Sequence, residues 1–385
     1  MVTLCFVVMN IGPIFDGCIV FPFGLIFYIF LNMTILDLDI LLNWYSENKR
    51  DLPWRSTHNP YFIWLSEIIL QQTRVNQGIA YYYRFIENFP TIQSLAHATE
   101  DEVLKHWQGL GYYSRARNLH KAANQIIVLH NGVFPVMYQD VISLCGVGEY
   151  TAAAICSFAY NLPYAVVDGN VYRVLSRLFG IDTPIDTGVG KRIFADKAQS
   201  ILNINQPALH NQAMMEFGAL QCVPANPNCD ICPFESSCIA RATDRVSLLP
   251  IKLKKTKVVE RYFNYLFIEN EGNTFLQKRT ANDIWRNLYE FPLIESTTLL
   301  EVHQLMENEF VSQLFDGVNE VKIESASSPF KHVLTHRIIY ARFFKISISN
   351  VSQQLLKMER LPILKINTLA VSRLMEIYIE NEVLA

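Results

Sequence analysis

The chain has 385 residues, which is long enough for two or three domains, each with a core of its own. Half of its residues are hydrophobic and 18% are charged, which excludes a largely disordered chain. The formal net charge of −3 argues neither for nor against a nucleic-acid partner, so any attraction to phosphate has to be local.

Residues 1–32 form an apolar stretch that contains no Lys or Arg and a single acid, Asp16. A signal peptide needs a positive segment before its apolar run, and this stretch has none, so we expect a cytoplasmic protein. Pro22 and Gly24 interrupt the run before it reaches the about 20 apolar residues of a membrane-spanning helix. We interpret Met33 as the start of the protein and the preceding residues as upstream sequence translated by mistake. A membrane anchor is the alternative.

A helical pattern runs from residue 36 to about residue 243. Polar breaks that contain Asn, Gly or Pro interrupt it at 59–60, 131–132, 144–148 and 161–163. This pattern predicts an all-α domain of about ten helices.

Glu67 lies in a helix that the sequence predicts to be buried. Asn59 can cap this helix and Pro60 suits its first turn, so the helix begins there. The helix is apolar almost all round, which indicates burial. Because burial disfavours the charged form, the pKa of the carboxyl should be raised, which makes it a proton donor near neutral pH. The alternative is a structural Glu at the polar end of a buried helix, paired with an Arg.

Gly146 and Gly148 precede a helix of small residues. Two glycines at this place let backbone N–H groups approach an anion at the positive end of the helix. The pattern therefore suits one DNA phosphate, and an ordinary turn between helices is the alternative.

Asp168 stands at the end of an apolar run and at the start of a helix, where it can act as the N-cap. A carboxylate held by helix N–H groups should keep a low pKa and stay charged. Protonated Glu67 and ionised Asp168 would divide the work of glycosidic cleavage, in which one acid protonates the leaving group and the other faces an oxocarbenium ion. The alternative is that Asp168 is only a helix cap.

Four of the eight cysteines follow the spacing C-x6-C-x2-C-x5-C within seventeen residues. In a long chain without a secretion signal, this spacing favours metal binding over disulfides. Zinc and an iron-sulfur cluster can each take four thiolates, so the spacing leaves both open. The four are Cys222, Cys229, Cys232 and Cys238, whereas Cys5, Cys18, Cys145 and Cys156 are scattered in apolar surroundings.

After the cysteines the sequence changes from a helical to a strand pattern. The segment from Arg241 to Arg261 contains seven Lys or Arg residues and two acids, with Pro250 in the middle. This composition predicts a basic linker. The remainder is predicted to be a smaller α+β domain. Its predicted strands are 261–268, 274–278 and 338–346, and its predicted helices are 299–310 and 368–380.

Several separate motifs occur in the order found in one enzyme superfamily. They are Ser-Glu-Ile-Ile-Leu-Gln-Gln-Thr at 66–73, Gly-Leu-Gly-Tyr-Tyr-Ser-Arg-Ala-Arg-Asn-Leu at 109–119, the glycine hairpin, Val-Asp-Gly-Asn-Val at 167–171, and the four cysteines. Together they resemble the helix-hairpin-helix DNA glycosylases, and within these the MutY-type adenine DNA glycosylases. The resemblance covers residues 36–243 and continues more loosely to the C-terminus.

The resemblance implies an architecture and a reaction. The expected chain is multidomain, with an all-α glycosylase domain that ends in a 4Fe-4S cluster loop and a C-terminal α+β Nudix-like domain. The implied reaction is hydrolysis of the N-glycosidic bond of adenine mispaired with 8-oxoguanine or guanine in double-stranded DNA, by a monomer without stable membrane association. A mismatch glycosylase of the same fold that acts on thymine or an oxidised pyrimidine is one alternative, and a DNA-binding protein with an inert pocket is another. The expected divisions are the extension 1–32, the glycosylase domain 33–221, the cluster loop 222–243, the linker 244–258 and the 8-oxoguanine recognition domain 259–385.

The resemblance also implies roles for single residues. Glu67 matches the general acid that protonates N7 of the extruded adenine, and Asp168 matches the carboxylate that stabilises or captures the sugar cation. Tyr150 and Asn170 match their helpers. Because relatives that cleave the strand carry a Lys where Tyr150 stands, we predict base excision without efficient strand cleavage. The implied adenine pocket is Trp54, Arg55, Leu70, Val75 and Gln212; the implied DNA-binding residues are Gln72, Thr73, Tyr112, Gly146, Gly148 and Thr151; and the implied cluster ligands are the four cysteines.

The sequence departs from the family pattern in three places. Cys145 stands in the hairpin where relatives usually have Pro. The segment 282–292 resembles a Nudix module, but the dense glutamates that hold magnesium are not found, so the domain should bind rather than hydrolyse. The triplet Leu334, Thr335 and His336 stands where the family reads 8-oxoguanine with Phe-Ser-His, and we predict that this recognition survives.

Overall fold

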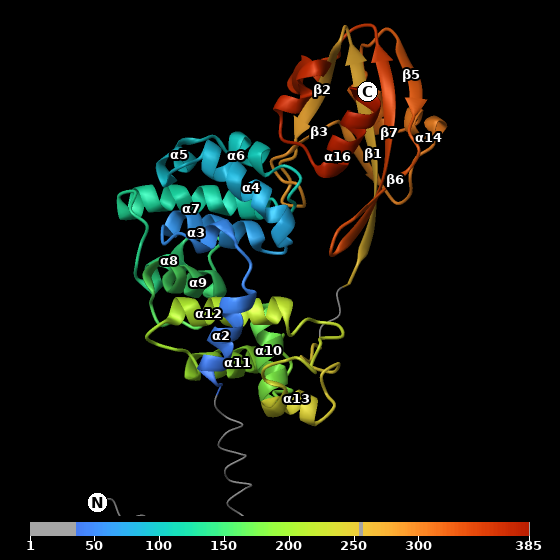
Figure 1. Ribbon diagram of the computed structural model, residues 1–385. Coiled ribbons are helices and arrows are strands. Elements are labelled where there is room, and N and C mark those ends of the chain that lie inside the picture. Colours follow the sequence, from blue (N-terminus) through green and yellow to red (C-terminus); the bar gives the residue numbers. More distant parts are fainter. Residues whose placement is uncertain (1–35, 254–256, 385) are drawn as a thin grey trace, which may run out of the picture.

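The computed structural model describes residues 36–253 and 257–384, which form a helical domain followed by a domain built on a β-sheet (Figure 1). The hypothesis about residues 1–32 lies outside the described residues. The α-helices of the first domain are α2 (Leu38–Asn48), α3 (Pro60–Leu70), α4 (Val75–Asn88), α5 (Ile92–His97), α6 (Glu100–Trp107), α7 (Ser114–His130), α8 (Tyr138–Ser143), α9 (Glu149–Tyr160), α10 (Gly169–Phe179), α11 (Gly188–Ser200), α12 (Pro207–Leu220) and α13 (Ile239–Ala242), and its 3₁₀ helices are η1 (Pro53–Arg55) and η2 (Glu235–Ser237).

Two hydrophobic clusters divide the helical domain into two layers. Helices α3 to α9 supply one cluster, which contains Trp64 and Ile155. Helices α2 and α10 to α12 supply the other, which contains Leu175 and Phe217. Figure 1 shows the second layer below the first. The chain crosses between the layers more than once, so residues distant in sequence meet at their boundary.

The caps predicted for two helices are confirmed. The side chain of Asn59 accepts a hydrogen bond from the backbone N–H of Tyr61, and Pro60 is the first residue of α3. The side chain of Asp168 accepts one from the backbone N–H of Val171 at the start of α10. Side-chain oxygens are favoured at these positions because they satisfy N–H groups that have no partner within the helix.

The C-terminal domain contains a mixed sheet of eight strands over the described residues. Its order is β3-β2-β1-β7-β5, and β4, β6 and β8 pair with β1, β7 and β2. Strands β1 and β7 are parallel over their whole length, whereas the other pairs are antiparallel. The strands predicted at 261–268, 274–278 and 338–346 are confirmed within β1, β2 and β7. The strands are β1 (Val259–Asn270), β2 (Asn273–Lys278), β3 (Tyr289–Glu290), β4 (Leu293–Ser296), β5 (Val321–Ala326), β6 (Phe330–Val333), β7 (Arg337–Ile348) and β8 (Glu359–Pro362).

Helices cover both faces of the sheet because alternate side chains of β1 point to opposite sides. Phe267 packs on the side of α16 (Arg373–Tyr378), where the ring of Tyr378 stacks on that of Phe343 with centroids 3.9 Å apart. Leu266 belongs to the cluster on the other side, together with Leu305 of α14 (Val302–Met306). The domain therefore has two apolar layers around one sheet (Figure 1).

The helices predicted in this domain are wrong in extent. The region 299–310 holds α14 and the start of α15 (Glu309–Leu314), because the side chain of Asn308 accepts from the N–H of Phe310 and begins a new helix. The region 368–380 becomes helical only after Ser372, whose side chain caps α16. The remaining short helices are η3 (Leu355–Lys357), η4 (Ile363–Thr368) and the π-helical turn η5 (Ile379–Val383).

The basic linker begins packed against the helical domain. The guanidinium of Arg177 donates to the carbonyl of Leu249, with the nitrogen 3.1 Å from the oxygen. The backbone N–H of Ile185 donates to the carbonyl of Ile251 at 3.0 Å. The described first part of the linker thus follows the surface of α10 and α11.

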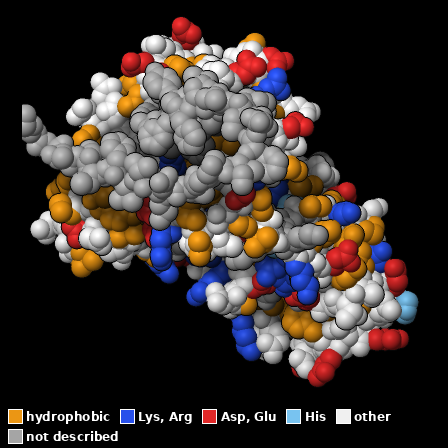
Figure 2. All heavy atoms as spheres, turned by 90° about the horizontal axis from the view of Figure 1, so that it is seen from below, with side chains coloured by type: hydrophobic (Ala, Val, Ile, Leu, Met, Phe, Trp, Pro, Cys, Tyr) orange, Lys and Arg blue, Asp and Glu red, His pale blue; other side chains and the backbone are white. Residues whose placement is uncertain are grey.

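Charges of both signs are mixed on one face of the molecule (Figure 2). On the face seen in Figure 2, lysine and arginine side chains lie singly or in small groups among acidic and hydrophobic ones, instead of forming one continuous basic field. This agrees with the formal net charge of −3. Within the described residues, none of the helices has both the length and the apolar composition needed to cross a bilayer.

Candidate active site

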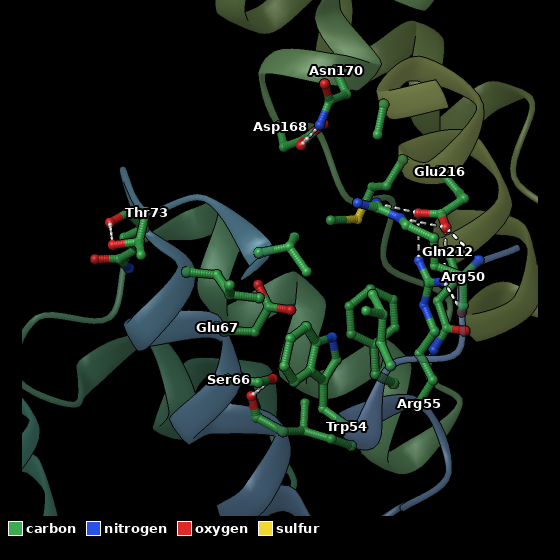
Figure 3. A pocket seen from close by; sticks show the side chains of 18 of the residues that line it. Arg50, Trp54, Arg55, Ser66, Glu67, Thr73, Asp168, Asn170, Gln212 and Glu216 are labelled. Carbon is green, nitrogen blue, oxygen red and sulfur yellow. Dashed lines mark hydrogen bonds and ion pairs between the residues drawn. The ribbon is translucent and has the colours of Figure 1, made fainter. Parts of the chain in front are cut away.

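A cavity of 460 Å³ opens at the boundary between the two helical layers (Figure 3). Side chains from α3 and α9 in one layer and from α10 and α12 in the other line it. Glu67 and Asp168 face it from opposite sides. The fold thus brings together two carboxyl groups that are 101 positions apart in the sequence (168 − 67).

Glu67 is buried on α3, with 6% of its surface exposed. Its Oε2 accepts a hydrogen bond from the hydroxyl of Tyr150, with the oxygens 2.7 Å apart. Burial raises the pKa of Glu67 to about 7, with a smaller rise from the charge of Asp168 and an opposing effect of the Tyr150 hydrogen bond. Among the described residues a tyrosine, and not an arginine, bonds this carboxyl. A carboxyl with this pKa can hold a proton near neutral pH and give it up.

Asp168 is held by donors on its own helix. The N–H of Val171 donates to Oδ1 at 2.7 Å, and the side-chain amide of Asn170 donates to Oδ2 at 2.8 Å. The expectation of a low pKa is wrong: burial raises the pKa of Asp168, and the bonds from Val171 and Asn170 only oppose that rise. The carboxylate of Asp168 accepts more hydrogen bonds than the carboxylate of Glu67. This favours loss of the Asp168 proton at a lower pH than loss of the Glu67 proton.

Tyr150 is a neutral hydrogen-bond donor to Glu67. It lies in the first turn of α9, two residues after the hairpin glycine Gly148. Burial raises its pKa well above the ordinary value, and the charges of Glu67 and Asp168 raise it further. The hydroxyl therefore keeps its proton and presents it to Glu67.

Asn170 connects Asp168 to the loop that carries the cysteines. Its side-chain oxygen accepts from a terminal nitrogen of Arg173 at 2.8 Å. The same guanidinium donates to the carbonyl of Gly218 at 2.6 Å and to that of Cys222 at 2.7 Å. Arg173 thus fixes the side-chain oxygen of Asn170, which leaves the amide nitrogen for Asp168.

All five residues expected for the adenine pocket line the cavity. They are Trp54, Arg55, Leu70, Val75 and Gln212. The side-chain oxygen of Gln212 accepts from the hydroxyl of Tyr45 at 3.0 Å, so its amide nitrogen is the part left to face a ligand. Many other side chains of the lining are polar or charged, and polar groups placed in a concave site can fix the orientation of a ligand.

Sequence reasoning missed Glu216, which anchors the wall of this cavity. Glu216 is 1% exposed and bonds both guanidinium groups, with 2.6 Å to Arg50 and 2.7 Å to Arg55. The hydrogen bonds from these arginines outweigh burial and lower the pKa of Glu216 to about 2. The sequence signal for this residue was a single Glu within the apolar pattern of α12. Its partners Arg50 and Arg55 are far away in the sequence, so the local pattern could not predict them.

Gln72 and Tyr112, which the resemblance implies are residues that wedge into the DNA duplex, both lie on strained backbone. Their φ angles are 55° and 48°, in the left-handed region that non-glycine residues seldom adopt. Arg115 holds both segments, because one terminal nitrogen donates to the carbonyl of Gln71 and the other to that of Gly111 at 3.1 Å. Arg115, also missed from the sequence, is buried beneath the two loops.

The glycine hairpin holds Gly146 in a conformation and a space that favour glycine. Gly146 has a φ of 78°, and a Cβ there would stand 2.6 Å from that of Asn118. Gly148 caps α9 without a side-chain hydrogen bond. Thr151 differs from the expectation of a surface contact: it is 2% exposed and accepts from the side chain of Gln71 at 3.2 Å. Thr73 lines the cavity mouth, where its hydroxyl lies 3.3 Å from the carbonyl of Gln71.

The four closely spaced cysteines gather around one small cavity beside Arg177 and Phe217. All four are free thiols, and Arg177 donates to the sulfur of Cys222 at 3.5 Å. Within the described ranges, no three His, Cys, Asp or Glu side chains are placed closely enough to hold a metal ion. Four thiols around one small cavity are nevertheless the donor set of a metal centre with four thiolates. The arrangement is compatible with zinc as well as iron.

A second cavity, of 560 Å³, lies between the two domains. The loop 109–114 lines one side, and Leu334, Thr335 and His336, between β6 and β7, line the other. Thr335 and His336 are exposed, and the hydroxyl of Tyr112 is hydrogen-bonded to that of Thr335. The expected recognition triplet thus faces the expected wedge.

The comparisons with known proteins agree with both domains. Residues 65–200 match the family described as HhH-GPD superfamily base excision DNA repair protein, and residues 264–381 match the NUDIX domain. The adenine DNA glycosylase of Buchnera aphidicola subsp. Baizongia pistaciae is 35% identical over 321 residues, which cover 83% of this chain and 88% of that protein. The adenine DNA glycosylase of Buchnera aphidicola subsp. Acyrthosiphon pisum is 40% identical over 255 residues, which cover 66% and 73%. A solved structure of a thermostable thymine-DNA glycosylase, 27% identical, superposes with a TM-score of 0.50 on 53% of this chain and 94% of its own.

Proposed function

The chain belongs to the adenine DNA glycosylases of base-excision repair, and from this premise we propose that it removes adenine mispaired with 8-oxoguanine or guanine in double-stranded DNA. The observation that carries the proposal is the pair Glu67 and Asp168 on opposite sides of one cavity. Their surroundings favour a proton on the first and a charge on the second. This is the division of roles that N-glycosidic hydrolysis requires.

In the proposed reaction, Glu67 donates its proton to N7 of an adenine extruded into the cavity. The bond between the sugar C1′ and adenine N9 then breaks, and its electron pair leaves with the base. Asp168 stabilises the cationic sugar or captures it as an ester. Water then adds to C1′, which breaks the bond to Asp168 where the ester has formed, and its proton passes to the Glu67 carboxylate left by the first step. The hydrogen bonds from Asn170 and Val171 hold the carboxylate of Asp168 in place.

We propose that the enzyme excises the base without efficient strand cleavage. Strand cleavage by related chemistry needs an amine that forms a Schiff base with the sugar. Tyr150 occupies the place beside Glu67, and a phenol cannot form that adduct. A high yield of borohydride-trapped enzyme on DNA would contradict this assignment.

The cavity between the domains supports recognition of 8-oxoguanine opposite the excised adenine. Thr335 offers a hydroxyl and His336 a ring nitrogen, both exposed at its edge. Leu334 replaces the aromatic residue of the family, so base stacking is lost while apolar contact remains. Faster excision of adenine opposite 8-oxoguanine than opposite guanine is the expected result, and equal rates would overturn it.

We also propose that Cys222, Cys229, Cys232 and Cys238 hold a 4Fe-4S cluster. When bound, the cluster would supply structural cross-linking and no bond cleavage, since the cysteines lie away from both carboxyl groups and line a cavity of their own. The protein itself contributes Arg177, which bonds the sulfur of Cys222 and the carbonyls of the following loop. Iron and zinc analysis of the purified chain distinguishes the two metals.

A thymine mismatch glycosylase is the second candidate, because the solved structure named above carries that description and shares the helical fold. Single-turnover excision from matched duplexes with A opposite 8-oxoguanine, A opposite G and T opposite G separates the candidates. Adenine release from the first two supports our proposal. Release of thymine alone would overturn it.

The catalytic assignment is tested with Glu67→Gln. The amide has the same shape but no proton of suitable acidity, so excision should fall by at least about 1,000-fold. Binding to the duplex should change little, as measured by fluorescence anisotropy. Retained excision in this variant would remove Glu67 from the reaction.

A further inference from the structure

Helix α6 runs along the contact between the two domains, at the end of the helical domain beside which the C-terminal domain stands (Figure 1). We propose that α6 is a docking helix that fixes the C-terminal domain before DNA binds, and that Asp101 and Gln108 are positioning residues for discrimination of the base opposite adenine. The second half of this proposal rests on the proposed function.

The N-terminal end of α6 presents two acids to the C-terminal domain. The carboxylate of Asp101 bonds the ammonium group of Lys278 and accepts from the hydroxyl of Tyr289 at 3.3 Å. The carboxylate of Glu100 accepts from the side-chain amide of Asn287. Negative side chains near a helix N-terminus interact favourably with the helix dipole, so these two acids also stabilise α6.

The C-terminal end of α6 makes a second set of contacts through Gln108. Its side-chain oxygen accepts from the backbone N–H of Val371 at 3.1 Å, and its nitrogen donates to the carboxylate of Glu376 at 2.8 Å. Nearby, the ammonium group of Lys105 donates to the carbonyl of Leu369 at 3.2 Å. The amide of Gln108 therefore has its donor and its acceptor satisfied across the interface.

Apolar burial joins the same surfaces. Trp107, Leu110 and Tyr113 belong to one continuous buried cluster with Val371 and Leu374 of the C-terminal domain. Domains joined only by polar contacts usually move relative to each other, whereas a shared apolar core holds them. The interface thus has the character of a fixed joint.

A strained turn on the C-terminal domain fits against this face. Trp285 and Asn287 have φ angles of 59° and 66°, which persist only where the surroundings hold them. On one side Asp283 is bonded by the guanidinium of Arg261 at 2.5 Å. On the other side Arg117 of α7 donates to the carbonyl of Arg286 at 2.8 Å.

The position of α6 sets the cavity between the domains. Gln108 leads directly into the loop 109–112, which ends at Tyr112 in contact with Thr335. With both ends of α6 fixed to the C-terminal domain, this cavity of 560 Å³ is already open without DNA. Preorganisation of this kind lowers the free-energy cost of binding the opposite base.

The test uses the full chain with Gln108→Ala, Lys278→Glu, and Lys278→Glu combined with Asp101→Lys. Gln313→Ala, in an exposed side chain of α15, is the matched control for the glutamine. Small-angle X-ray scattering without DNA measures the radius of gyration, and circular dichroism verifies the fold. Single-turnover excision gives the ratio of rates for A opposite 8-oxoguanine and A opposite G.

We expect a larger radius of gyration for Gln108→Ala and Lys278→Glu, and its restoration in the charge-swapped double variant. If the docked population falls to about a tenth, the rate ratio at subsaturating enzyme should fall about tenfold. An unchanged radius in both variants overturns the docking role. A larger radius with an unchanged ratio overturns the positioning role. If the unmodified chain releases no adenine, the proposed function fails, whereas the scattering result still decides docking.

Discussion

Glu67 and Tyr150 form a pair in which the tyrosine tunes the acid. Burial raises the pKa of Glu67 to about 7, and the hydrogen bond from Tyr150 restrains that rise because it stabilises the carboxylate. Near pH 7, part of the Glu67 population is therefore ionised and cannot donate a proton. The alkaline side of the pH profile should report this single group.

Substitution of Tyr150→Phe should move the alkaline limb of the excision profile to higher pH. In the proposed reaction the excision rate requires protonated Glu67, so this rate should fall as the pH rises through the pKa of that group. Loss of the Tyr150 bond raises this pKa further, because an effect that lowers it is removed. Single-turnover rates between pH 5 and pH 10 measure the shift. A limb that stays in place or moves to lower pH would contradict the assignment, whatever the maximal rate.

Glu216→Gln should destabilise the protein by about 3 kcal/mol at neutral pH, because two guanidinium groups lose the buried charge that pairs them. The folded pKa of about 2 lies below the ordinary 4.5, so this stabilisation is complete above pH 4.5 and is lost as the pH falls towards 2. Urea unfolding at pH 7 and pH 3 tests both the size and the sign. The substitution Glu307→Gln, at an exposed residue, is the control. A loss of unfolding free energy in Glu216→Gln that was larger at pH 3 than at pH 7 would refute this account.

At the scale of elements, Arg115 connects the two segments that carry the expected wedge residues Gln72 and Tyr112. It bonds carbonyls at the end of α3 and in the loop before α7. Both segments contain a left-handed non-glycine residue, which such a clamp can hold in place. The fork of a guanidinium can serve several carbonyls at once, whereas an ammonium group is a single point charge.

Arg115→Lys should therefore release the two loops although the charge is kept. We expect duplex binding to weaken by about tenfold and stability to fall by about 2 kcal/mol, with the excision rate of the saturated complex less affected. Titration of the duplex under single-turnover conditions separates binding from the bond-breaking step. Arg192→Lys on the exposed face of α11 is the matched control. Equal behaviour of the two variants would show that the fork is not needed.

Local sequence patterns predicted the features that depend on interactions between neighbouring residues. The caps at Asn59 and Asp168 follow from one residue and its helix, and the strands of β1 and β7 follow from their apolar composition. Arg115 and Glu216 could not be predicted in this way, because their partners lie up to 47 and 166 residues away. The pKa of Asp168 was misjudged for the same reason: its burial depends on the other helical layer.

At the scale of the whole molecule, the four-cysteine loop and the linker form one connected region. Arg177 donates to the carbonyls of Val223 and Pro224 in the cysteine loop and of Leu249 in the linker, so a single guanidinium contacts both parts of this region. The sulfur of Cys238 lies 3.5 Å from the carbonyl of Arg177. The cysteine loop and the described first part of the linker are thus both held to α10 through Arg177.

Cys238→Ser should loosen the linker and make the chain more sensitive to proteolysis between residues 244 and 258. Serine is a poor ligand for the proposed cluster, and without the cluster the loop loses its cross-link. A local opening free energy lowered by about 1.4 kcal/mol gives about tenfold faster cleavage. Limited trypsin digestion followed by mass spectrometry locates the cut among the linker lysines. Cys145→Ser, which removes a thiol outside this region, is the control, because Cys145 lies in the glycine hairpin. Equal cleavage of both variants would mean that the cysteine loop does not hold the linker.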